Sequence, residues 1–199
     1  PRSGVGLRPD GLPDIAWCPV ASGTPPKAEP GAAIPAFSIG RYLVTHAQFQ
    51  AFVKAADGFA TDRWWQEPSK LAARQPGPGK PAWPLTNHPA ERVSWYDAVA
   101  FTRWLTARLR ANGELQGSQE IRLPTEQEWL LAASGGNAPR EYPWGSKYVD
   151  GFANLDERGL LGFLRVGKTY LGRTTAVGVY LHGQSPCGAL DMAGNVWEW

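Results

Sequence analysis

Cysteine and histidine are scarce in this sequence of 199 residues, which holds two cysteines and three histidines. Cys18 and Cys187 are too few for a disulfide-dense scaffold or for a zinc site with four cysteine ligands. One bridge between them is possible, but two separate thiols, packed as small buried residues, are favoured. The histidines lack metal-binding spacing such as H-E-x-x-H, and the turn-like "NHP" around His88 favours a structural hydrogen bond for that residue.

Long apolar runs and a strong charge excess are also absent. No apolar run approaches the ~20 residues that a membrane helix needs, so no membrane span is predicted. The net charge of +2 gives no bulk reason to expect a nucleic-acid partner. The chain opens at Pro1 without a methionine or a signal-peptide pattern, so we expect it to be an excerpt of a longer protein, and no compartment is indicated.

Glycine, proline and tryptophan are abundant instead, with 23, 18 and 10 residues respectively. The glycines and prolines are spread along the chain, and disordered chains are poor in aromatic residues. This composition predicts an ordered, loop-rich domain.

Three helices and two strands are predicted from local patterns. "DIAWCPV" and "AFSIGRYLVT" read as strands. Each helix is expected to begin directly after a capping residue whose hydrogen-bonding partner lies three positions later in the sequence. Gly135 and Gly136 should end the third helix. The three pairs are Thr45 with Gln48, Ser94 with Asp97, and Thr125 with Glu128.

The remaining segments predict ordered loop. Residues 59–92 have no sustained periodicity and are expected to form a long surface loop, anchored to the body by Trp64, Trp65 and Trp83. From 137 to 187 the sequence shows turns and short β-like pieces. Strands and helices alternate too poorly for a doubly wound sheet, so an α+β domain with little regular structure is predicted.

Searches for catalytic motifs are negative. There is no G-x-S-x-G nucleophile elbow, "GVGLRPDG" lacks the strand and helix of a dinucleotide loop, and "GPGK" lacks the rest of a P-loop. We therefore predict no catalytic residue in this chain.

Two carboxylates in "GALDMAGNVWEW" suggest a metal instead. Asp191 and Glu198 flank a glycine-bearing loop, and calcium prefers oxygen ligands from carboxylates and backbone carbonyls. The alternative is a plain turn, with Asp191 as a local cap. Trp197 and Trp199 are expected to be core anchors.

Five segments then resemble the formylglycine-generating enzyme family, also called the sulfatase-modifying-factor domain. They are "IGRYLVTHAQFQAFV", "NHPAERVSWYDAVAFTRWL", "IRLPTEQEWLLAASGG", "YPWG" and "GALDMAGNVWEW", in the family's order and spacing. The resemblance covers about Phe37 to Trp199. It implies a family domain at 37–199 whose C-terminal part is missing, preceded by an N-terminal extension or linker at 1–36.

This resemblance implies a C-type-lectin-like α+β fold with structural calcium. One family calcium site maps onto Asp191, Gly194, Val196 and Glu198. The other begins at Asn154 and Leu155, and its partners are expected near residues 169 and 171.

The resemblance leaves two main functions open. Oxidase members of the family use a redox cysteine pair that binds copper and lies downstream of "GNVWEW", and neither Cys18 nor Cys187 matches it. Because a shared fold does not make an enzyme, the favoured interpretation is non-enzymatic. It is a scaffold that binds a protein or other macromolecular ligand, like the variable proteins of diversity-generating retroelements, with its variable residues beyond Trp199.

The alternative is a formylglycine-generating oxidase that uses copper and O2 on a protein cysteine, with its cysteine pair beyond Trp199. An accessory domain fused to a kinase or similar partner is a third, weaker hypothesis.

Overall fold

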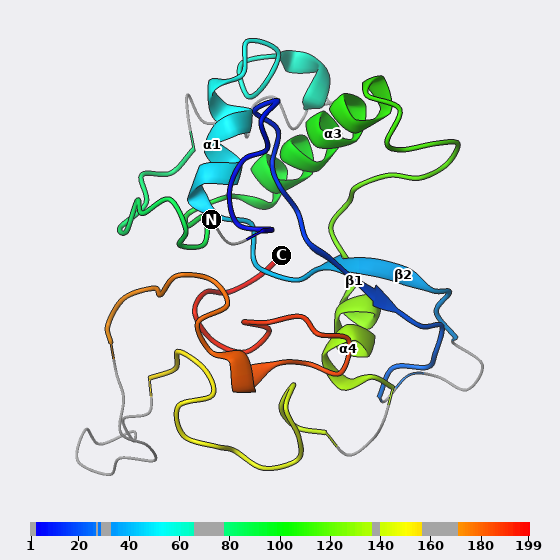
Figure 1. Cartoon of the computed structure of the whole chain (residues 1–199), viewed down its shortest axis with the longest axis vertical. Coiled ribbons are helices and arrows are strands. Elements are labelled where there is room, and N and C mark those ends of the chain that lie inside the picture. The colour runs from blue at the N-terminus through cyan, green and yellow to red at the C-terminus, as the bar shows by residue number, and fades with distance from the viewer. Residues whose placement is uncertain (1–2, 27, 29–32, 66–77, 137–139, 157–170) are drawn as a thin grey trace.

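The computed structural model describes the whole chain except residues 1–2, 27, 29–32, 66–77, 137–139 and 157–170. Its regular elements are few, and they are joined by long ordered loops (Figure 1). In chain order they are β1 (Trp17–Val20), β2 (Phe37–Gly40), α1 (His46–Lys54), η1 (Asp62–Trp64), α3 (Trp95–Ala111), α4 (Glu126–Ser134) and η2 (Leu181–Gly183). The prediction of a mixed α and β domain with little regular structure is confirmed.

All three predicted helix starts are confirmed. α1, α3 and α4 each begin after a capping box. In each box, the side chain of the capping residue accepts a hydrogen bond from the backbone N–H three residues later. The side chain of that later residue accepts a hydrogen bond from the backbone N–H of the capping residue. α4 ends at Gly135, which adopts a left-handed conformation with φ of 70°. Local hydrogen bonding therefore sets these boundaries before tertiary contacts are considered.

An aromatic core holds α1 against α3, which lie side by side in Figure 1. Both helices turn large apolar side chains toward each other, and the turn after α1 adds Phe59. The rings meet edge-on or tilted, an arrangement that aromatic pairs favour, with centroids 5.5–6.2 Å apart. The core rings are Phe49, Phe52, Phe59, Phe101 and Trp104.

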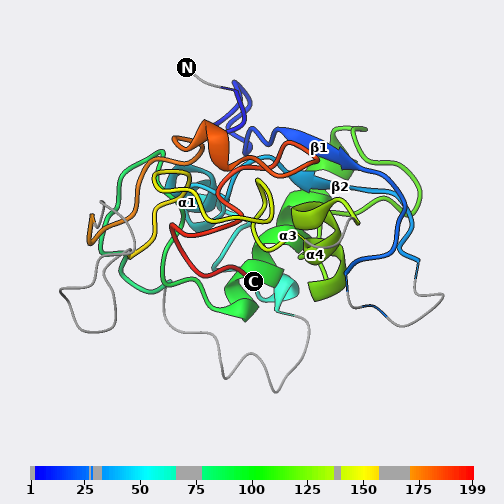
Figure 2. The same cartoon turned by 90° about the horizontal axis from the view of Figure 1, so that it is seen from below.

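A second apolar cluster joins the sheet, α4 and the C-terminal segment. β1 pairs antiparallel with β2, and Val20 of β1 packs with Leu131 and Ala132 of α4. Ala189 and Met192 of the C-terminal segment complete the cluster. This packing places the C-terminal segment beside β1 and α4. The C-terminus lies near the middle of the view in Figure 2.

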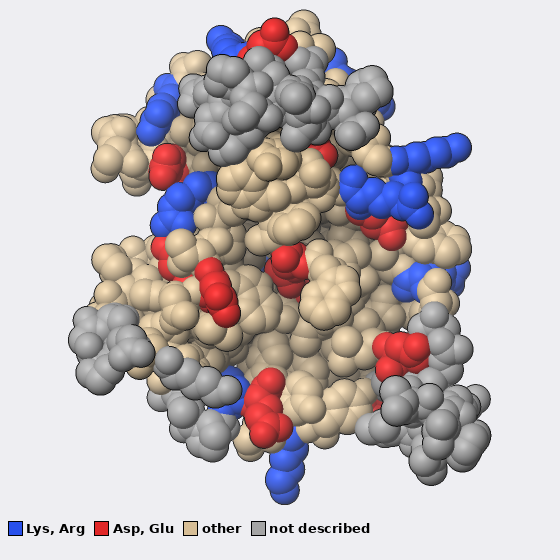
Figure 3. Space-filling model, turned by 180° about the vertical axis from the view of Figure 1, so that it is seen from behind, with Lys and Arg blue, Asp and Glu red and all other residues tan. Residues whose placement is uncertain are grey.

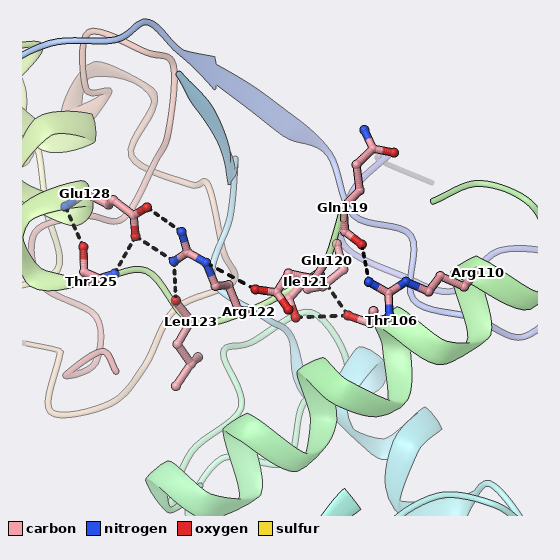
Figure 4. Close-up of polar contacts among 9 residues, drawn as sticks. All are labelled: Thr106, Arg110, Gln119, Glu120, Ile121, Arg122, Leu123, Thr125 and Glu128. Atoms are coloured by element: carbon pink, nitrogen blue, oxygen red, sulfur yellow. Dashed lines mark hydrogen bonds and ion pairs between the residues drawn. The ribbon is translucent and has the colours of Figure 1, made fainter. Parts of the chain in front are cut away.

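The segment between α3 and α4 is fixed to both helices (Figure 4). At one end, Ile121 exchanges two hydrogen bonds with the Thr106 hydroxyl of α3, at 2.8 and 3.0 Å. At the other, both terminal nitrogens of Arg122 donate to the two carboxylate oxygens of Glu128 in α4, at 2.6 and 2.7 Å. Hydrogen bonds from Arg122 hold the pKa of Glu128 down at about 2.

The N-terminal segment packs against the domain. Leu12 belongs to the aromatic core cluster, and the Thr45 hydroxyl donates to the carbonyl of Val5 at 2.9 Å. The Gln48 amide donates to the carbonyls of Gly4 and Asp14. Residues 3–20 therefore contact both the start of α1 and the core, while the division at residue 36 stays a prediction.

Two expectations for the loops are only partly met. Trp64 and Trp65 are buried as predicted, but Trp83 is 38% exposed and is not an anchor. Of the β-like pieces expected at 137–187, those within the described residues form isolated bridges, turns and the short 3₁₀ helix η2 instead of strands. "GFLRVGKTYLG" falls mostly outside the described residues. No helix among the described residues is long and apolar enough to cross a bilayer.

Candidate calcium loop

The C-terminal loop turns through three residues with positive φ. Asp191, Gly194 and Asn195 have φ of 62°, 80° and 67°. Aspartate and asparagine tolerate this left-handed region better than most residues with a side chain. At Gly194 a Cβ atom would lie 2.5 Å from the carbonyl oxygen of Asn154, so the close approach of these two backbone segments requires glycine.

Asn154 lies directly against this loop. Asn154 and Gly194 form a parallel bridge, and the N–H of Asn195 donates to the carbonyl of Asn154 at 2.9 Å. The resemblance assigned Asn154 to a different calcium site from the loop, whereas the structure places the backbone of Asn154 against the loop itself. Among the partners expected for Asn154, residue 169 lies outside the described residues, and Leu171 is 43% exposed.

The two candidate acids differ in their surroundings. Asp191 is 5% exposed, and its carboxylate accepts the N–H of Gly178. The Glu198 residue is exposed as a whole, yet atoms packed around its carboxyl group raise the pKa of that group to about 7. A hydrogen bond from the Trp129 indole opposes this rise in pKa, and the negative charge of Asp191 adds to it.

These residues are chemically suited to a calcium ion. The candidate donors are the Asp191 and Glu198 carboxylates and the carbonyls of Gly194 and Val196, all of them oxygens. A cation bound near both acids would favour their charged forms, which the present surroundings of Glu198 disfavour. The described residues contain no group of three His, Cys, Asp or Glu side chains that could hold a metal, so the loop carbonyls would have to take part.

The two terminal tryptophans are not core residues. Trp197 is fully exposed and Trp199 is 59% exposed, with its indole N–H donating to the carbonyl of Val93 at 2.8 Å. The expectation that they anchor the core is wrong. Ala189, Leu190 and Met192 are the buried apolar residues of this segment, and Ala189 and Met192 pack in the cluster with β1 and α4.

A pocket of about 310 Å³ adjoins the loop. Its lining includes Asn154, Asn195 and Val196 from the loop region, with Trp83 and Glu91 from the segment before α3. In Figure 3, Asp and Glu side chains are scattered over the visible face, including its middle, and most Lys and Arg side chains lie toward its edge. Among the described residues on this face, no continuous basic patch of the kind that binds nucleic acid is seen.

Both cysteines are free thiols, as the sequence favoured. Cys18 is buried in β1, and burial raises its pKa. Cys187 is half-buried, and its sulfur lies 3.2 Å from the Ser185 hydroxyl. The predicted structural role of His88 is also confirmed, because its Nδ1 lies 2.9 Å from the Thr174 hydroxyl.

Asn195 is the residue of this site that sequence reasoning missed. The available signal was an asparagine directly after a glycine within a loop, a pairing typical of tight turns.

Comparison with known proteins gives one matching family. The model of the "Sulfatase-modifying factor enzyme 1-like domain" matches residues 19–199. Hercynine oxygenase of Mycobacterium tuberculosis is 32% identical, over 83% of this chain and 37% of its own length. Formylglycine-generating enzyme of Thermomonospora curvata is 31% identical, over 82% of this chain and 58% of its own length. The inactive Cα-formylglycine-generating enzyme 2 of Mus musculus is 35% identical, over 68% of this chain and 39% of its own length.

Proposed function

The chain belongs to the sulfatase-modifying factor enzyme 1-like domain family, and from that membership we propose that it forms the scaffold of an oxygen-dependent oxidase of the formylglycine-generating type. One observation carries the proposal: two relatives, one named formylglycine-generating enzyme and the other hercynine oxygenase, match more than four fifths of this chain. This support favours the oxidase alternative over the ligand-binding scaffold that the sequence alone favoured. The chain spans about two fifths and three fifths of the lengths of these two relatives, so the activity is proposed for a protein that includes it.

The described residues do not supply the copper site of such an oxidase. Cys18 lies in β1 and Cys187 lies beside α4, close enough for a negative charge on Cys187 to raise the pKa of Cys18, but neither matches the positions of the family's redox pair. No cluster of three metal-binding side chains is present in the described part of the chain. We therefore derive no reaction step from these residues. Their proposed contribution is the frame that holds substrate-binding and catalytic loops in place.

We further propose a C-type-lectin-like fold stabilised by structural calcium. The small sheet, the three separated helices and the long ordered loops are compatible with that fold. Asp191, Gly194, Val196 and Glu198 would hold the ion, with Asn154 fixed against the same loop. Bound calcium would neutralise the acid pair and fix the loop that joins it.

A peptide assay tests the oxidase proposal. The natural gene would be sequenced past the codon for Trp199, and its whole product incubated with copper, O2 and a C-x-P-x-R peptide. Conversion of the peptide cysteine to an aldehyde, captured by an aminooxy probe, is expected. A peptide in which serine replaces that cysteine is the control. If the cysteine peptide yields no aldehyde, the formylglycine-generating activity is excluded; a parallel reaction with hercynine then tests the chemistry named for the other relatives.

A non-catalytic binding domain is the second candidate. It is favoured by the inactive relative from Mus musculus. A family cysteine pair in the natural gene would argue against this candidate, and variable codons beside a repeat template would argue for it. The third hypothesis, an accessory domain fused to a kinase, is supported by a relative named serine/threonine-protein kinase pkn1, of Chlamydia pneumoniae, which is 30% identical over 82% of this chain and 22% of its own length.

A further inference from the structure

Asn195 makes a two-point contact with a distant backbone segment. Its side-chain oxygen accepts the N–H of Thr175 at 2.9 Å, and its side-chain NH2 group donates to the carbonyl of Thr175 at 3.2 Å. The amide side chain thus pairs with both backbone groups of one residue, much as a neighbouring strand would. A side chain held by both a donor and an acceptor has little freedom to rotate.

The backbone of Asn195 is fixed from the other side. Its N–H donates to the carbonyl of Asn154 at 2.9 Å, and the Asn154 amide donates to the carbonyl of Arg173 at 2.9 Å. The same Asn154 amide lies 3.4 Å from the Asn195 side-chain oxygen. Three segments that are far apart in the sequence, around residues 154, 173–175 and 195, therefore meet at Asn195.

The 173–178 segment is also held by a candidate calcium ligand. Gly178 donates its N–H to the carboxylate of Asp191, while Thr175 contacts Asn195. Asp191 and Asn195 thus hydrogen-bond to the same segment at Gly178 and Thr175, three residues apart. Thr174, next to Thr175, lies against His88, which joins this segment to the loop before α3.

Asn195 stands between the two proposed carbonyl ligands, Gly194 and Val196. Fixing its side chain and its positive φ of 67° fixes the two peptide groups that flank it, and these include the Gly194 carbonyl. Groups outside the ligand set orient the ligands themselves, and their loss commonly weakens metal binding by 10- to 100-fold, to an order of magnitude. We infer that Asn195 is a positioning residue of the calcium loop, which locks the loop to the 173–175 segment and to Asn154. This inference rests on the proposed calcium site.

The decisive variant is Asn195→Gly. Glycine adopts positive φ without strain, so the substitution removes the amide side chain and leaves the turn possible. Titration calorimetry with CaCl2 alone is expected to show binding weakened by about tenfold or more. In hydrogen exchange, the Thr175 amide should lose protection. Asn112→Gly, the same substitution at an exposed position after α3, is the control and should leave calcium affinity unchanged.

A second variant covers the case in which Asn195→Gly fails to fold. Asn195→Asp keeps the acceptor for the Thr175 N–H and replaces the donor to the Thr175 carbonyl with a negative oxygen. An added negative charge alone would tighten calcium binding, so weaker binding by this variant supports the positioning role. Equal or tighter binding by Asn195→Asp overturns the inference, as does unchanged affinity in a folded Asn195→Gly protein.

These measurements use no oxidase reaction, so the inference and the proposed activity fail separately. If the wild-type protein binds no calcium, the inference falls with the calcium site. If calcium binds and the peptide assay is negative, the inference stands.

Discussion

At the scale of single residues, Gly194 is the position where the loop tolerates least change. Its φ of 80° disfavours any side chain, and a Cβ atom there would lie 2.5 Å from the Asn154 carbonyl oxygen. Because that neighbour is backbone, relief requires a shift of the loop or of the segment around Asn154. We expect Gly194→Ala to lower the free energy of unfolding by about 2–4 kcal/mol, measured by urea denaturation in the presence of chelator.

Gly113→Ala separates the cost of a positive φ from the cost of a steric clash with the Cβ atom. Gly113 has a similar φ of 75°, but nothing lies within 4 Å of the place where its Cβ atom would be. Only the positive φ should count there, at a cost of about 1–2 kcal/mol. Equal destabilisation by the two substitutions would contradict the role given to the Asn154 contact.

At the scale of elements, the ion pair between Arg122 and Glu128 ties α4 to the segment that precedes it (Figure 4). The Glu128 residue is 8% exposed, and its pKa of about 2 in the folded protein lies below its ordinary value of 4.5. A lowered pKa means that the contribution is complete above pH 4.5 and is lost as the pH falls from there toward 2. Because the Arg122 side chain is 49% exposed, we discount the contribution to about 1–2 kcal/mol.

Glu128→Gln should therefore lower stability by about 1–2 kcal/mol at pH 7 and show a shallower loss of stability between pH 4.5 and 2 than the wild type. Denaturant titrations at several pH values measure this. Glu126→Gln in the same first turn is the matched control, because Glu126 is exposed and forms no ion pair among the described residues; its effect should stay within about 0.5 kcal/mol. The same pH profile for wild type and Glu128→Gln would rule out this role.

The elements also show what could be predicted from the sequence. The capping pairs at Thr45, Ser94 and Thr125 act over three residues, so the sequence contains all the information needed to place those helix starts. By contrast, the burial of a side chain in a loop is not set by the residues next to it in sequence. The exposure of Trp83 and Trp197, and the meeting of Asn154 with Gly194, depend on contacts between distant segments, and loops have no periodicity that reveals them.

At the scale of the whole molecule, the candidate calcium loop connects parts that no regular element joins. It packs through Met192 on the cluster of β1 and α4, binds the 173–178 segment, and lies against Asn154. An ion that binds only the native state stabilises all of these contacts at once, by about 2.7 kcal/mol when it is present at 100 times its dissociation constant.

For a domain of this size, that free energy corresponds to a rise in melting temperature of about 5–10 °C. We therefore expect chelation of protein prepared in saturating calcium to lower the melting temperature by this amount, measured by scanning calorimetry. Asp191→Asn is the matched variant, because asparagine also suits φ of 62° while the substitution removes one of the two acids. The chelator-induced shift should be much smaller in this variant, since calcium would retain only one carboxylate ligand. If chelator does not change the wild-type melting temperature, starting from saturating calcium, the proposal that calcium stabilises this fold is wrong.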